Sequence, residues 1–134
     1  MFYYELFQSV ILFKEDTTMN VLMIGPGAYP RQAELGEGLT AMQQAVGGPI
    51  QVIYPFQDPV ALICHEEGKL IGLPLNRAPR DEDGEIYDII AGPFFICGAP
   101  LDSENFTSLT EEQMTHYKER FHPIELYLKR RDTR

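Results

Sequence analysis

The chain has 134 residues, of which 44% are hydrophobic, and a formal net charge of −9. This length fits one domain that can fold without a metal or disulfide staple. The charge is uneven, because residues 1–117 carry 17 acidic and 5 basic side chains, whereas residues 118–134 carry 3 and 6. An acidic body repels a phosphate backbone, which argues against direct nucleic-acid binding by the main domain.

The first 18 residues differ in character from the rest of the chain. Residues 1–13 are mostly apolar, but they lack the basic region and cleavage site of a signal peptide and are too short to span a bilayer. A polar break then leads to Met19 and to residues 20–24 (NVLMI), which are typical of an opening strand. We expect the domain to begin at Met19 and residues 1–18 to be an extension outside the native domain. The alternative is an added strand or an amphipathic interaction segment.

Short apolar runs and turn residues alternate through the first half of the domain. Gly25-Pro26-Gly27 closes the opening strand with a turn, and Gly47-Gly48 supplies the stop that ends a helix. β-branched residues favour strand on both sides of the proline-bracketed loop at 55–59. The predicted elements are strands at 21–24, 31–35, 50–54 and 60–64 and a helix at 38–46.

The second half of the domain predicts a hairpin followed by further strands. The EEGK sequence at 66–69 predicts a tight turn in which Gly68 takes a positive φ, with a return strand at 70–73. A polar loop is expected at 81–85. Strands are then expected at 86–91 and 94–97, interrupted by Gly92-Pro93.

The last helix has a clear start signal. Thr110-Glu111-Glu112-Gln113 is the pattern of a capping box, and Pro123 disfavours helix in the residue before it, so we expect a helix over about 110–122. The pattern allows a helical continuation over 124–128.

Strands outnumber helices, and most strand connections are too short for crossover helices. The sequence therefore predicts an α+β fold: a small antiparallel or mixed sheet with one short helix and one C-terminal helix packed on it. We expect residues 19–128 to form a single domain and residues 129–134 to be a basic tail.

Cysteine and histidine usage gives no sign of redox or metal chemistry. Cys64 and Cys97 each end an apolar run, which favours buried free thiols over a disulfide or a reactive thiol and points to the cytoplasm. The histidines His65, His116 and His122 lack the spacing of a metal site. We predict no metal, no cofactor and no catalytic residue.

A polar segment between apolar runs, at 76–81 (NRAPRD), holds the best candidate site. The planar arginine fork binds carboxylate or phosphate in a bidentate manner, and asparagine can bind backbone or an amide-like ligand edge. The alternatives are that the arginines pair with nearby carboxylates and order the loop, or that the segment is catalytic. The predicted ligand- or partner-binding residues are Asn76, Arg77, Arg80, Asp81 and Asp88.

Several spaced motifs resemble a known family. They are Gly47-Gly48, Glu66-Glu67-Gly68-Lys69, Gly72-Leu73-Pro74 with Asn76-Arg77, and Asp88-Ile89-Ile90-Ala91-Gly92-Pro93. In this order they are similar to the family filed as domain of unknown function 3846, over roughly Met19 to Phe121. His65 stands where many members have Asn, and residues 1–18 have no counterpart. The resemblance implies a small protein of phages, plasmids or conjugative elements, and it implies no activity.

The sequence leaves two alternative functions. The first is a non-enzymatic accessory protein of a mobile element, a binding or protein-interaction module for an unknown host protein or small ligand, with no membrane partner. The second is a small enzyme acting on a phosphate- or carboxylate-bearing substrate through Arg77, Asp88 and His65. The second requires these side chains to converge in one pocket. Because the sequence contains no recognised catalytic motif, it favours the first.

Overall fold

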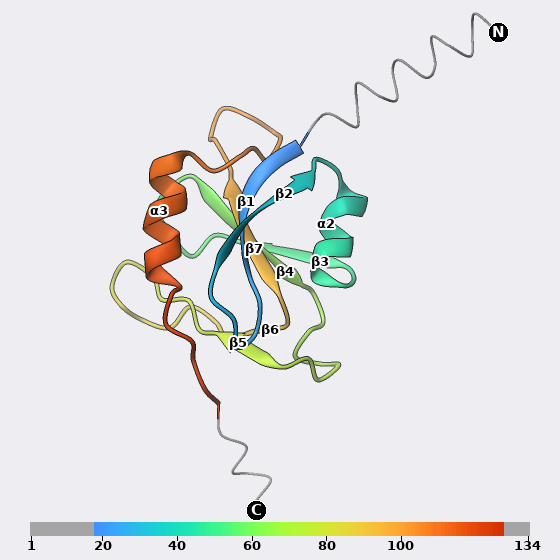
Figure 1. The fold of residues 1–134 in the computed structure, drawn as a ribbon, viewed down its shortest axis with the longest axis vertical. Coiled ribbons are helices and arrows are strands. Elements are labelled where there is room, and N and C mark those ends of the chain that lie inside the picture. The colour runs from blue at the N-terminus through green and yellow to red at the C-terminus, as the bar shows by residue number, and fades with distance from the viewer. Residues whose placement is uncertain (1–17, 128–134) are drawn as a thin grey trace, which may run out of the picture.

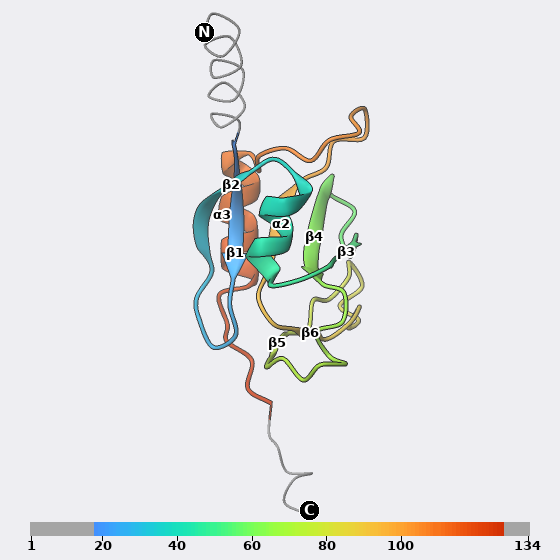
Figure 2. The same cartoon turned by 90° about the vertical axis from the view of Figure 1, so that its right-hand side faces the viewer.

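A five-stranded sheet forms the centre of the protein in the computed structural model, which describes residues 18–127 (Figure 1). The strand order is β2-β1-β7-β4-β3, and every neighbouring pair is antiparallel. A second sheet pairs β5 with β6 and lies beyond one end of the first (Figures 1 and 2). The predicted α+β fold is confirmed. The elements are β1 (Thr18–Ile24), β2 (Arg31–Gly36), α2 (Leu39–Val46), β3 (Ile50–Ile53), β4 (Val60–His65), β5 (Leu75–Arg77), β6 (Ile90–Ala91), β7 (Phe94–Gly98) and α3 (Glu111–Arg120).

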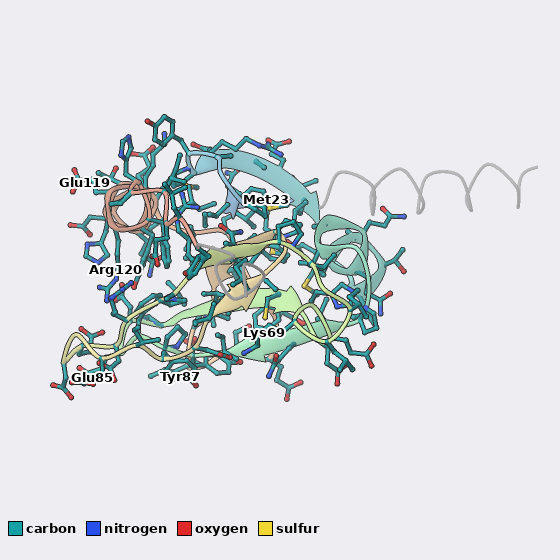
Figure 3. The ribbon with its side chains drawn as sticks, turned by 90° about the horizontal axis from the view of Figure 1, so that it is seen from below. Met23, Lys69, Glu85, Tyr87, Glu119 and Arg120 are labelled. Carbon is teal, nitrogen blue, oxygen red and sulfur yellow. The ribbon has the colours of Figure 1, made fainter. Side chains whose placement is uncertain are left out.

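The two helices cover opposite faces of the large sheet (Figures 1 and 3). On the α3 side, strand residues such as Leu62 form a buried cluster with Met114 and Tyr117. On the α2 side, the intervening strand residues, such as Ile63, form a second cluster with Val46. Because both faces are covered, every residue of β4 and β7 is buried, which explains the uninterrupted apolar sequences of these strands.

Both predicted helices are confirmed, with ends set by local chemistry. Gly47 closes α2 in the left-handed conformation (φ 88), and its N–H donates to the carbonyl of Gln43. At the start of α3, the Thr110 hydroxyl accepts from the Gln113 N–H and the Gln113 amide accepts from the Thr110 N–H, both at 3.0 Å. The helical continuation is not formed over 124–127, where the chain has no regular structure.

The link between β4 and β5 differs from the prediction. The chain makes successive turns there, and the return strand at 70–73 is not formed. Gly68 does not adopt a positive φ, which occurs instead at Gly72 (φ 81). Position 68 has room only for glycine, because a Cβ there would lie 2.6 Å from the carbonyl oxygen of Ala91 in β6. The turn therefore packs directly on β6.

The predicted strand at 86–91 is much shorter in the structure, where only β6 forms a strand. The Asp81 carboxylate accepts hydrogen bonds from the N–H groups of Asp83 (2.9 Å) and Glu85 (3.0 Å). This local bonding holds residues 81–85 as the expected polar loop. Within 86–91 the Ile89 N–H donates to the Asp88 carboxylate at 2.7 Å, so the backbone there has a partner other than a neighbouring strand.

The ends of the chain leave part of the predicted organisation untested. Most of the predicted extension, residues 1–17, and the end of the chain, residues 128–134, lie outside the described residues. Thr18 already belongs to β1, opposite Gly36, and Met19 is only 1% exposed. The domain start at Met19 stays a prediction. In the part of the chain that is described, neither helix has the length and apolar character that crossing a membrane requires.

The contact between Gly68 and Ala91 gives a first prediction. Gly68→Ala should destabilise the protein by about 1–3 kcal/mol, because the added methyl group meets backbone that cannot move without disturbing β6. Gly25→Ala is the control, since a Cβ there meets only the Ala28 side chain, at 3.9 Å. Urea unfolding of both variants measures the difference, and equal stabilities would show that the turn is not packed on β6.

Candidate functional site

A pocket of about 450 Å³ opens between the end of β4, the turns after it, and residues 88–91. The Gly68 contact with β6 brings these segments together. The pocket therefore joins two stretches of sequence that the chain separates by about 20 residues. Its lining includes Gln51, Cys64, Lys69, Leu70, Asp88 and Ile90.

The floor of the pocket carries a thiol that is kept protonated. Cys64 is 3% exposed and lies on the α3-facing side of β4, opposite Gln51 of β3. Burial, followed by the negative charge of Asp88, raises the pKa of Cys64 to about 11, against the opposing effect of Lys69. A thiol with this pKa is a poor nucleophile at neutral pH.

An ion pair stands at the mouth of the pocket. The Lys69 Nζ lies 2.8 Å from Asp88 Oδ1, and these side chains are 56% and 36% exposed. The same Asp88 oxygen accepts the Ile89 N–H at 2.7 Å, which fixes the carboxylate. Figure 3 places Lys69 near the middle of the underside of the protein, with Tyr87 and Glu85 toward one side. Exposed pairs of this kind contribute at most about 1 kcal/mol, so the pair can open for a ligand.

Asn76 and Arg77 lie inside the protein, and each is 0% exposed. The Asn76 amide donates to the carbonyls of Ile24 (3.0 Å) and Gly92 (2.9 Å) and accepts from Arg77 Nη1 (2.9 Å). Arg77 donates to the carbonyl of Phe121 through Nε (3.1 Å) and Nη2 (2.9 Å). These side chains therefore bind the protein's own backbone.

The surroundings of Arg77 explain why a cation is tolerated there. Arg77 Nη2 also donates to the Ala28 carbonyl at 2.8 Å, so the guanidinium meets two backbone carbonyls and one amide oxygen. Phe121 caps the carboxyl end of α3, where the helix dipole favours positive charge. Burial lowers the pKa of Arg77, and the nearby Glu125 and Tyr127 oppose that effect. We assign Asn76 and Arg77 a structural role in this conformation.

Arg80 and Asp81 organise the loop between β5 and β6. The Arg80 Nη1 donates to the carbonyl of Ala78 at 2.6 Å and lies 3.3 Å from Glu125 Oε2. The sequence alternative expected this arginine to pair with a nearby carboxylate, whereas its partner is Glu125, 45 positions away. Asp81 uses its carboxylate to bind backbone N–H groups of its own loop.

Two of the three side chains of the enzyme hypothesis, His65 and Asp88, line the pocket, and Arg77 does not join them. The His65 Nδ1 accepts the Glu67 N–H at 3.0 Å, and the imidazole packs against Gly48, where a Cβ would lie 2.4 Å from Nε2. Arg77 is buried at the end of α3, and Asp88 stands at the pocket. Of the five predicted site residues, Asp88 alone lines this pocket.

Sequence reasoning missed Lys69 and Gln51 as pocket residues. The sequence pattern places Lys69 in a hairpin turn, although it is one of two lysines in residues 1–117, and this rarity in an acidic body was the available signal. Gln51 carries no signal, because its role depends on being paired with Cys64 across two strands. Among residues 18–127, no group of three or more His, Cys, Asp and Glu side chains is placed to hold a metal ion.

Comparison with known proteins gives one match. Residues 19–122 match the profile of the family described as Domain of unknown function (DUF3846). No curated protein and no solved structure matches the chain.

The charges around Cys64 give a second prediction. Asp88→Asn should speed alkylation of Cys64 by iodoacetamide at pH 9 several-fold, because removing a negative charge lowers the thiol pKa and raises the thiolate fraction. Lys69→Ala should slow the same reaction. Cys97, whose pKa burial alone raises to about 12, is the internal control. Peptide mass spectrometry follows both sites. Faster labelling in both variants would mean that access, and not charge, governs Cys64.

The buried arginine gives a third prediction. Arg77→Ala should destabilise the protein by about 3–5 kcal/mol, because it leaves the carbonyls of Ala28 and Phe121 without their donor and opens a cavity. Arg80→Ala, which removes an exposed ion pair, should change stability by less than about 1 kcal/mol. Chemical unfolding compares the two. If both variants lose a similarly small free energy of unfolding, the hydrogen bonds of Arg77 are not essential to the fold.

Proposed function

The chain belongs to the family of Domain of unknown function (DUF3846), and we propose that it is a non-enzymatic binding module whose site is the pocket bordered by Lys69 and Asp88. The resemblance of its motifs to small proteins of phages, plasmids and conjugative elements supports a role as an accessory protein of a mobile element. The partner we propose is a host protein or a small ligand.

One observation carries this proposal: the pocket combines apolar walls with a charged mouth, while its thiol is kept protonated. Leu70 is 83% exposed at the rim, and Ile90 and Ala91 line the interior. Pockets that combine apolar walls with a few oriented polar groups are typical binding sites. The ion pair of Lys69 with Asp88 supplies those polar groups.

The position of the pocket supports specific recognition. Its walls belong to β4, β6 and the turn between them, and Gly68 holds this turn against β6. Sites built on rigid elements keep their geometry, which lowers the entropic cost of binding. Free, buried Cys64 and Cys97 are in keeping with a cytoplasmic location, which is part of the proposal.

The proposal predicts that ligands act through the rim of this pocket. In a screen of uncharged small-molecule fragments followed by amide NMR shifts, hits should perturb residues 64–70 and 88–91 together. Leu70→Glu should abolish these shifts, because it places a charge at an apolar rim.

Leu101→Glu is the matched control, since Leu101 is 97% exposed and does not line the pocket. It should bind the hits as the unchanged protein does. Unfolding midpoints of the two variants should agree, because both side chains are exposed. Hits that gather elsewhere, or that survive Leu70→Glu, would overturn the proposal.

A further inference from the structure

We propose that the pocket receives the arginine or lysine side chain of a basic segment of a partner protein, an inference that rests on the proposed binding function. The protein itself holds a stand-in for such a ligand. Lys69 already presents an ammonium group on an aliphatic stem to Asp88, at 2.8 Å. The site therefore already binds an alkylammonium group, and because this ion pair is exposed, an incoming cation can replace Lys69.

The carboxylate of Asp88 has capacity for a second cation. Both hydrogen bonds that it accepts from the described residues, from Lys69 Nζ and the Ile89 N–H, end on Oδ1. Its Oδ2 accepts none within residues 18–127, so an incoming guanidinium can bind there or replace Lys69.

The charge around the pocket favours a cation over an anion. Glu66 and Glu67 line it together with Asp88, and Lys69 is the one lysine or arginine among its lining residues. Residues 18–127 as a whole carry 16 acidic and 6 basic side chains. A field of this sign speeds the approach of basic partners and disfavours acidic ones.

The apolar part of the pocket fits the stem of a long basic side chain. Leu70, Ile89 and Ile90 contribute aliphatic surface to the lining of the pocket. Arginine and lysine bury their methylene groups along such surface while the charged head binds an acceptor. Gln51, an exposed residue of the lining, has only a weak contact between its amide oxygen and the Cys64 thiol, at 4.0 Å, and this oxygen can accept from a donor. Because a guanidinium has five N–H donors, we expect arginine to bind more tightly than lysine.

The volume indicates a peptide segment as the occupant. About 450 Å³ exceeds the needs of one side chain and lies within the range of small-ligand sites. Leu70 and Ile71, which are 83% and 56% exposed, offer apolar contact for the residues that flank the basic one. A partner segment therefore fits the pocket and its rim together.

The test uses the full chain and two peptides, acetyl-Ala-Arg-Ala-amide and its citrulline counterpart, which has the same shape without the charge. NMR titration should show the arginine peptide shifting amides of residues 67–70 and 88–91. Asp88→Asn should weaken binding by about tenfold or more, since a charge-assisted hydrogen bond is worth roughly 1.5–3 kcal/mol. This variant keeps an oxygen to accept the Ile89 N–H, so the local fold is retained.

Lys69→Ala gives the sharpest result, because its sign depends on the ligand. For a cationic ligand the variant removes a competitor for Asp88 and should tighten binding several-fold. For an anionic ligand it would remove the attracting charge and weaken binding. Asp83→Asn, which makes the same charge change outside the pocket, should leave the affinity unchanged.

Three outcomes would overturn the inference: equal binding of the citrulline peptide, weaker binding by Lys69→Ala, or shifts confined to other surfaces. If acetyl-Ala-Glu-Ala-amide binds the pocket and loses affinity in Lys69→Ala, the binding function stands and the cationic ligand is wrong. The chain's own basic residues 129–134 are the competing occupant. A variant tests them that combines Lys129→Gln, Arg130→Gln, Arg131→Gln and Arg134→Gln. If the arginine peptide binds only this variant, the chain's own basic residues occupy the pocket, which contradicts the inference of a partner segment.

Discussion

The buried guanidinium of Arg77 is the interaction on which one end of this fold depends. It donates to the carbonyl of Phe121 at the end of α3 and to the carbonyl of Ala28 after β1. It also donates to the amide oxygen of Asn76. Asn76 in turn binds the carbonyls of Ile24 and Gly92. Four backbone carbonyls from three separate segments are satisfied by two adjacent side chains, so a mismatch at either would leave buried acceptors unpaired.

This network also positions the pocket. Asn76 lies in β5 and Ile24 ends β1, so the bond between them holds the small sheet against the large one, whereas the bond to Gly92 ties β5 to the residue after β6. Through Gly68, β6 positions the turn that carries Lys69, and Asp88 lies two residues before β6. The buried Asn76 and Arg77 thus help to set the geometry of the Lys69–Asp88 ion pair at the mouth of the pocket. The residues that line the pocket lie outside β5, so the proposed binding site and the Asn76–Arg77 network use different side chains.

Local sequence patterns were sufficient for the helices and the central strands. The capping box at Thr110 and the glycine stop at Gly47 act on adjacent residues, so both helices could be predicted. The return strand at 70–73 and most of the strand at 86–91 could not, because turn packing on β6 and side-chain bonding by Asp88 to the Ile89 N–H override strand propensity there. The ligand- or partner-binding role of the five site residues stays a prediction, and the burial of Asn76 and Arg77 could not be predicted for a similar reason. An arginine fork suits a ligand and a backbone carbonyl equally, and the carbonyls lie 44 and 49 residues from Arg77.

The central claim is that Arg77 links the end of α3 to the small sheet that forms the pocket wall. Native-state hydrogen exchange of Arg77→Lys tests it most directly, because a lysine cannot bridge two carbonyls with a fixed fork. We predict that protection falls together at the Phe121 amide, which bonds within α3, and at the Gly92 amide, which bonds to Pro74, while amides between β1 and β2 keep theirs. Loss at Phe121 with full protection at Gly92 would contradict the claim.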